Sequence, residues 1–227
     1  MDSIDIIKII AAVLALIVAI VGHEIMHGWV AYKYGDHTAK SAGRLSINPI
    51  IHVDLFGTIL VPLMTYFLPV LMGAESGFLF GWAKPVPVNM QTVVQNGGYN
   101  AAMQVDLAGI VYNFTLAAVT ASLLLVMSEP TAASGFVEIL FFIFLIKLLL
   151  INVVLGVFNL LPIPQFDGAH FIMHLSMKLR LNEIANFFYR LEQRGYGMII
   201  VIIILVTPIK DYVLIMPVQM ILNLLLN

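Results

Sequence analysis

The chain has 227 residues, of which 61% are hydrophobic and only 11% are charged, and its mean hydropathy is +0.99. A soluble domain usually carries about 25% charged residues, so this composition indicates an integral membrane protein with no separate soluble domain. The net charge of −2 excludes the basic surface that nucleic-acid binding requires, and the lack of cysteine excludes disulfides and thiolate metal sites. The expected partners are the lipid bilayer and other proteins, and no feature of the sequence indicates an oligomeric state.

Three segments are apolar nearly all round and long enough to cross a bilayer as helices. They cover about residues 4–34, 100–127 and 136–161. Between the first two, residues 54–73 are apolar but interrupted by Gly57, Pro62 and Pro69. The sequence GWAKPVPVN (81–89) follows, and its alternating prolines favour an extended backbone.

The chain after the third segment divides into two parts. Residues 173–194 are polar and basic with apolar residues at helical spacing, which predicts that the region 168–194 is helical and lies at the membrane interface. Residues 196–227 form an apolar membrane segment that is too long for one straight span and short for two. We expect a single domain over residues 1–227 with a membrane core at 4–170.

Basic residues predict the orientation in the membrane, because cytoplasmic loops carry an excess of Lys and Arg. Those in loops or interfacial segments are Lys33, Lys40, Arg44, Lys84, Lys178, Arg180, Arg190 and Arg194. The connection 128–135 has Glu129 and no basic residue, so it is expected on the outer face. The region 45–99 must then begin and end on the cytoplasmic side, which excludes a single full crossing at 54–73. The predicted fold is an all-α polytopic protein of the cytoplasmic membrane, a helical transmembrane bundle with a Pro/Gly-rich re-entrant or extended hairpin segment.

The first apolar segment ends with the sequence HEIMH at residues 23–27. His23 and His27 share one helical face at i and i+4, a spacing at which two imidazoles can bind one tetrahedral zinc ion. In H-E-x-x-H proteases the glutamate, here Glu24, does not bind the metal but takes a proton from water. The alternative is a chance match in which the histidines bond to neighbouring helices, but ionisable residues at membrane depth are costly and usually functional.

A catalytic zinc ion needs a third protein ligand. We favour Asp167, because NLLPIPQFDGAH (159–170) places a carboxylate after a proline-broken helix end. The predicted topology also brings the ends of the first and last spans to the same side, the cytoplasmic one. The other candidates are His37, His52, Asp54, Asp106, His170 and His174.

HEIMH followed by the pattern N-x-x-P-x-x-x-x-D-G resembles the site-2 protease family of intramembrane zinc metalloproteases, specifically its short bacterial members without a PDZ domain. The residues in register are Asn159, Pro162, Asp167 and Gly168. Residues 43–58 and 80–89 resemble the same branch. Ile110 and Gln165 depart from the pattern, since relatives commonly have proline at both positions.

The resemblance implies that His23, His27 and Asp167 bind one zinc ion per chain. Glu24 would be the general base, and Asn159 would polarise or stabilise the scissile carbonyl, unless it forms a plain helix–helix hydrogen bond. The implied activity is hydrolysis of peptide bonds within or near transmembrane segments of single-span membrane-protein substrates, at an active site toward the cytoplasmic side.

Several alternatives stay open. A membrane zinc or ion transporter would also place polar residues inside spans, but transporters tend to have repeated halves and none is found here. A different membrane metalloprotease would not explain the register from Asn159 to Asp167. The extended residues 81–89 can pair with a substrate strand or form a rigid loop. His52 can face the cavity or bridge to Asp54, while His170 and His174 are expected as interfacial polar residues or as partners of the metal ligands.

Overall fold

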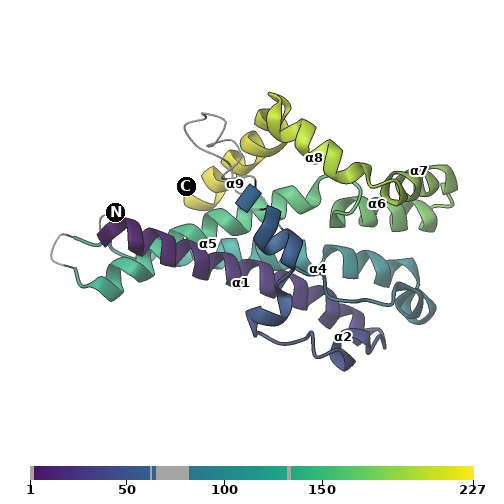
Figure 1. The fold of residues 1–227 in the computed structure, drawn as a ribbon, viewed down its shortest axis with the longest axis horizontal. Helices are drawn as coiled ribbons and strands as arrows, with labels where there is room; N and C mark the ends of the chain where they lie inside the picture. Colours follow the sequence, from purple (N-terminus) through teal and green to yellow (C-terminus); the bar gives the residue numbers. More distant parts are fainter. Residues whose placement is uncertain (1–2, 62, 65–81, 132–133) are drawn as a thin grey trace.

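The computed structural model describes residues 3–61, 63–64, 82–131 and 134–227, and within these ranges every regular element is a helix (Figure 1). Three helices, α1 (Ser3–Lys33), α4 (Met90–Val126) and α5 (Phe136–Leu160), are long and apolar enough to cross a membrane. The predicted all-α polytopic fold is therefore confirmed. Helices α1, α4 and α5 all pack against one another, and this three-helix bundle carries the other elements.

One row of small side chains on α1 determines how closely the bundle packs. Ala11, Ala15 and Ala19 follow one another at i+4 spacing, and each is fully buried. Small residues allow helix backbones to approach closely in a membrane. The same row continues through residues 23 and 27, so the two histidines of HEIMH face the interior of the bundle.

Helix α4 begins ten residues before the predicted span at 100–127. Its first two turns precede a kink at Gly98, which has φ +66°, and Asn89 caps the start by accepting a hydrogen bond from the Thr92 N–H. The residues before the kink are too polar to be recognised as part of a span. They instead extend the helix beyond the apolar bundle.

The start of α4 lies beside the end of α1. The Asp36 carboxylate accepts a hydrogen bond from the Asn89 N–H at 2.6 Å, and the Asn96 amide donates to the Tyr34 carbonyl at 2.8 Å. The region between these helices therefore begins and ends at the same end of the bundle, as the predicted hairpin requires. Part of that hairpin, residue 62 and residues 65–81, lies outside the described residues.

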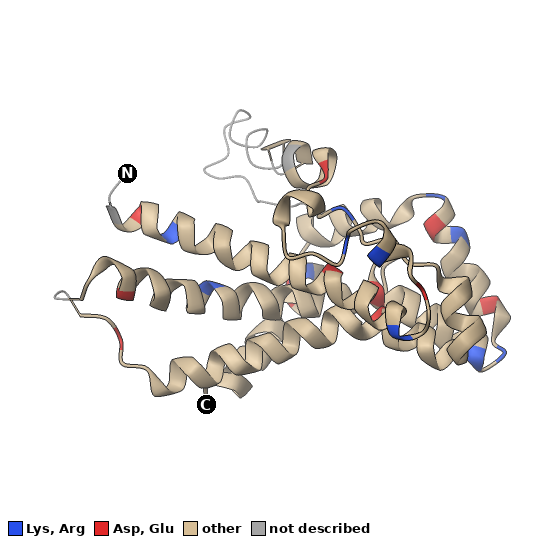
Figure 2. Cartoon of the chain, turned by 90° about the horizontal axis from the view of Figure 1, so that it is seen from below, with Lys and Arg blue, Asp and Glu red and all other residues tan. Residues whose placement is uncertain are grey.

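Three short helices, α2 (Thr38–Ser41), η1 (Pro49–His52) and η2 (Leu55–Leu60), lie in the described part of the connection between α1 and α4. Figure 2 shows that most Lys and Arg residues gather at this end of the molecule, away from the N-terminus. The connection between α4 and α5 lies at the opposite end, beside the N-terminus (Figure 1). The charge asymmetry that the sequence predicts is thus present along the bundle axis.

Helices α6 (Asp167–Lys178) and α7 (Asn182–Gln193) form the predicted interfacial region. Helix α6 packs against α4, and α7 packs against α6. The chain turns between them at Arg180, which has φ +60°.

The C-terminal segment consists of α8 (Tyr196–Val206), η3 (Asp211–Ile215) and α9 (Met216–Leu226). The axis bends by 94° between α8 and the following helices. Because of this bend, the apolar segment 196–227 can be longer than one straight span and shorter than two. Helix α9 returns to pack on α4 and α5, where Val218 joins a buried apolar cluster with Val153 and Val157.

Candidate metal centre and active site

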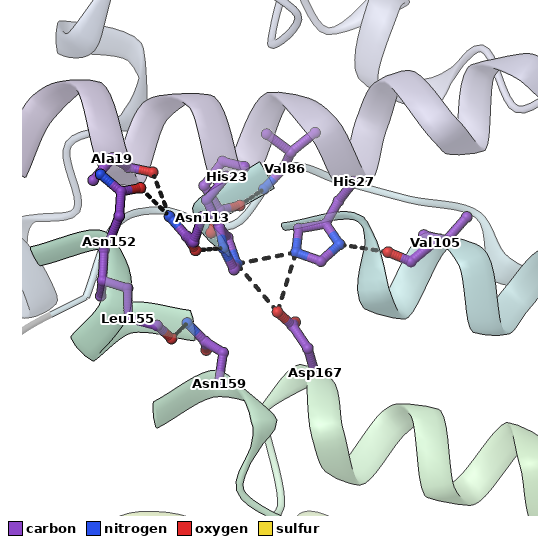
Figure 3. Close-up of polar contacts among 11 residues, drawn as sticks. Ala19, His23, His27, Val86, Val105, Asn113, Asn152, Leu155, Asn159 and Asp167 are labelled. Atoms are coloured by element: carbon purple, nitrogen blue, oxygen red, sulfur yellow. Dashed lines mark hydrogen bonds and ion pairs between the residues drawn. The ribbon is translucent and has the colours of Figure 1, made fainter. Parts of the chain in front are cut away.

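Three potential metal ligands from two helices meet inside the bundle (Figure 3). The Nε2 atoms of His23 and His27 lie 3.1 Å apart, and the Asp167 Oδ2 lies 3.1 Å from the first and 3.4 Å from the second. Around a tetrahedral metal ion with bonds of about 2.0–2.2 Å, donor atoms lie about 3.3–3.6 Å apart. The observed triangle is close to this size, so the three residues could hold a metal ion.

Hydrogen bonds on the far side of each imidazole fix which nitrogen faces the candidate metal position. The His27 Nδ1–H donates to the Val105 carbonyl at 2.7 Å, and the His23 Nδ1–H donates to the Asn113 Oδ1 at 2.7 Å. The Asn113 amide nitrogen is committed elsewhere, because it donates to the Asn152 side chain at 2.8 Å. In its neutral form each imidazole therefore directs an Nε2 lone pair toward the carboxylate, as metal-binding histidines do.

The Asp167 Oδ2 is buried and accepts no aligned hydrogen bond. Two imidazole lone pairs and a carboxylate oxygen at these distances would repel one another if no proton or cation lay between them. A bound cation would turn this repulsion into attraction. The arrangement therefore fits a metal ion that binds nitrogen and oxygen ligands.

Gly109 of α4 lies directly against the imidazole ring of His23. A Cβ atom built on Gly109 would lie 2.4 to 2.5 Å from three atoms of the His23 ring. Any larger residue would push the imidazole away from its present position. Val105, Gly109 and Asn113 recur at i+4 spacing, so one face of α4 supports both histidines.

A second glycine explains the D-G pair of the sequence pattern. A Cβ atom on Gly168 would lie 2.3 Å from the Leu160 carbonyl oxygen, which is backbone and cannot move aside easily. The first turn of α6 therefore packs directly on the end of α5, beside Asp167. Gln165, which precedes Asp167 in the loop, has φ +79°, a backbone conformation that proline could not adopt.

A cavity of about 740 Å³ opens beside the three potential ligands, within the usual size of a ligand site. Glu24 lines it, and its Oε2 accepts a hydrogen bond from the Val86 N–H at 2.8 Å. Since Pro85 and Pro87 have no N–H, Val86 offers the only backbone donor of residues 85–87. Asn159 also lines the cavity, and one of its amide hydrogens bonds to the Leu155 carbonyl at 3.1 Å.

Residues 82–88 are extended along one side of the cavity. The Lys84 N–H donates to the His52 carbonyl at 2.9 Å, and the Lys84 carbonyl accepts from the Arg44 guanidinium at 2.7 Å. The Trp82 N–H donates to the Gly57 carbonyl at 3.0 Å. One edge of this segment is thus hydrogen-bonded to residues 44–57, an earlier part of the same connection between α1 and α4.

Three of the candidate ligands on that loop do not join the metal group. The His52 Nε2–H donates to the Ser46 carbonyl at 2.9 Å, so this side chain neither lines the cavity nor bridges to Asp54. Asp54 accepts a hydrogen bond from the Gly57 N–H at 2.7 Å. The ring of His37 stacks edge-on against Tyr32 with centroids 4.9 Å apart.

The remaining candidates form two pairs near the cavity. His174 donates from Nδ1 to the Asp106 carboxylate at 2.7 Å, and His170 lies 3.3 Å from the Glu192 carboxylate. Burial opposes the charged form of His170, but the hydrogen bond and charge of Glu192 outweigh it and raise the pKa of His170. The same hydrogen bond lowers the pKa of Glu192. Among the described residues, only His23, His27 and Asp167 form a group compact enough to hold a metal ion.

Comparison with known proteins agrees with this arrangement. The family model described as Peptidase family M50 matches residues 11–205. The chain is 37% identical over 209 residues to "Putative zinc metalloprotease YwhC" of Bacillus subtilis (strain 168), covering 89% of this chain and 83% of that protein. It is 30% identical over 188 residues to "Putative zinc metalloprotease Rip2" of Mycolicibacterium smegmatis, covering 82% of this chain and 62% of that protein. No solved structure matches.

Proposed function

The chain belongs to peptidase family M50, the site-2 protease family, and from this membership we propose that it is an intramembrane zinc endopeptidase. Its proposed reaction is hydrolysis of peptide bonds within or near the transmembrane segments of single-span membrane proteins. The observation that carries the proposal is the triangle of His23, His27 and Asp167 donor atoms with Glu24 in the same cavity.

His23, His27 and Asp167 are proposed to hold one zinc ion. Two imidazoles and a carboxylate are a usual donor set for a catalytic zinc site, which keeps a fourth position open. When bound there, zinc acts as a Lewis acid for the scissile carbonyl and brings the pKa of water to about 7.

Glu24 is the proposed general base. It immediately follows His23 in α1 and lines the same cavity, while the Val86 N–H holds one of its carboxylate oxygens. The other oxygen is then available to take a proton from the attacking water and return it to the leaving amine. Because the hydrogen bond from Val86 holds the Glu24 carboxylate in place, both proton transfers occur at the same position.

Asn159 is proposed to bind the scissile carbonyl. One amide hydrogen is used within α5, on the Leu155 carbonyl, and the second is available on the side of the cavity. A fixed donor aimed at the oxygen where negative charge develops stabilises the transition state.

The extended residues 82–88 are proposed to hold the substrate. A helical substrate hides its carbonyls in its own hydrogen bonds, so it must be extended before cleavage. An irregular segment beside the cavity can pair with such a substrate through backbone hydrogen bonds. We place this cavity toward the cytoplasmic side, because the Lys and Arg residues gather at that end of the bundle (Figure 2).

The test compares wild type with Glu24→Gln, purified in detergent and reconstituted with a single-span substrate. Glu24→Gln should retain zinc, because the carboxylate is not a ligand, and should lose cleavage. A chelator should inhibit the wild type reversibly. Normal cleavage by Glu24→Gln would contradict the proposal, as would zinc transport into liposomes that depends on His23 and His27.

A further inference from the structure

The position of Asp167 depends on how α6 packs in the bundle, because this residue is the first of that helix. Helix α6 packs mainly against α4. Its buried residues are Gly168, Ala169, His174 and Ser176. His174 is the only large side chain among these buried residues, so it is the one best placed to fix where α6 lies along α4.

His174 makes one described hydrogen bond to α4, and its ring also stacks on Tyr99 of that helix with centroids 6.5 Å apart. Its Nδ1–H donates to the Asp106 Oδ2 at 2.7 Å, and the two residues are only 7% and 3% exposed. A buried pair of this kind contributes little net stability compared with an apolar pair, but separating its partners is costly because it leaves a buried polar group unpaired. The contact lies two helical turns along α6 from Asp167.

Asp106 directly follows Val105, whose carbonyl accepts the hydrogen bond from His27. One turn further along α4, Gly109 supports His23. Neighbouring residues of α4 therefore contact both the histidines of α1 and helix α6, which carries Asp167.

We propose that Asp106 and His174 are positioning residues that set the register of α6 on α4, so that the Asp167 carboxylate reaches the metal position between His23 and His27. The inference deepens the proposed function and rests on it. A slip of α6 by one residue would move Asp167 by about 1.5 Å. Metal–ligand distances tolerate only about 0.2 Å, so such a slip would remove the third ligand.

His170 on the same helix provides a matched control. It is one turn nearer to Asp167, but it pairs with Glu192 of α7 and leaves a third of its side chain exposed. It makes no described hydrogen bond to α4. If any change on α6 disturbed the site, His170→Leu would act as strongly as His174→Leu.

The experiment measures zinc affinity of the full chain in detergent by competition with a chromogenic chelator. His174→Leu should bind zinc about 10–100-fold more weakly, the usual effect of removing a group that supports a ligand. His174→Asn should stay near wild type, because its amide nitrogen occupies the place of Nδ1. His170→Leu should also bind normally.

Two further variants separate positioning from a general structural role. His174→Gln keeps a buried donor but places it about one bond farther from the backbone, so the fold should persist while zinc affinity falls. In an Asp167→Ala background, His174→Leu should have no further effect on residual zinc binding.

Wild-type affinity in both His174→Leu and His174→Gln would overturn the inference, and so would an equal loss in the presence and absence of Asp167. Either result would leave the proposed function intact. A wild-type chain that bound no zinc would overturn both.

Discussion

Replacing Gly109 with alanine gives a strong test of the metal site, because the change adds one methyl group beside His23. The new Cβ atom would lie 2.4 Å from Cε1 and 2.5 Å from both ring nitrogens of His23, whereas ordinary contacts begin at 3.4 Å. The imidazole must therefore retreat by about 1 Å, or the helices must separate by a similar distance.

A retreat of about 1 Å has two effects on His23. It stretches the 2.7 Å hydrogen bond to Asn113 beyond bonding range, and it moves Nε2 well outside the tolerance of a metal bond. We expect Gly109→Ala to weaken zinc binding at least about 100-fold, equivalent to about 2.7 kcal/mol, and to abolish cleavage.

The same substitution favours the helix itself, since alanine is a better helix former than glycine by about 1 kcal/mol. The variant should therefore fold, and chelator competition on purified protein measures its zinc affinity. Gly135→Ala is the matched control, because nothing lies within 4 Å of the added atom and the φ of −71° is ordinary. Zinc affinity of Gly109→Ala equal to that of the control would refute the assignment of His23.

Three other expectations concern the ligand set, the topology and a pH-dependent contact. Asp167→Ala should lose most of its zinc, because a catalytic site needs three protein ligands, and full occupancy by metal analysis would mean that another residue completes the site. Since the chain has no cysteine, single cysteines can replace Lys84 and Thr131; an impermeant thiol reagent should label the first from the cytoplasmic face and the second from the outer face, and labelling of both from one face would contradict the topology. For His170 and Glu192, the lowered pKa of Glu192 gives stability that is lost as pH falls through its folded pKa, and the raised pKa of His170 gives stability that is lost as pH rises through its folded pKa. The stability that His170→Gln removes, below about 1 kcal/mol for a partly exposed pair, should be largest near pH 4.5–6.5, and thermal unfolding that shows a pH-independent difference would argue against the pair.

The spans could be predicted from the sequence because apolar length alone decides them. Predicted helices at 4–34 and 136–161 correspond to α1 (Ser3–Lys33) and α5 (Phe136–Leu160). The start of α4 could not be predicted in this way, because residues 90–97 are polar and Gly98 interrupts the helical backbone. The size of the C-terminal bend, 94°, could not be predicted either, although Pro208 marks the place where the helix breaks.

The sequence pattern and the family resemblance suggested the ligands, and the structure brings His23, His27 and Asp167 together. Their metal-binding role, like the catalytic roles of Glu24 and Asn159, stays a prediction.

The supporting residues were missed because a contact across 90 positions, such as that of His23 with Asn113, leaves no local pattern. A usable signal was nevertheless present, since an asparagine in an apolar span needs a partner. Asn113 and Asn152, in two different spans, in fact bond to each other.

The acceptors behind the two histidines have a consequence for charge balance in the membrane. The Nδ1–H of His27 donates to a peptide carbonyl and that of His23 to a side-chain amide oxygen, so neither Nδ1–H is bonded to a carboxylate. The anionic groups proposed to act at the metal are then Asp167 and Glu24 alone. Their two negative charges neutralise one divalent cation, so the loaded centre adds no net charge to surroundings of low dielectric constant, where an unbalanced charge is most costly. The empty centre would instead leave two carboxylates uncompensated, and zinc binding should therefore raise the thermal stability of the whole chain.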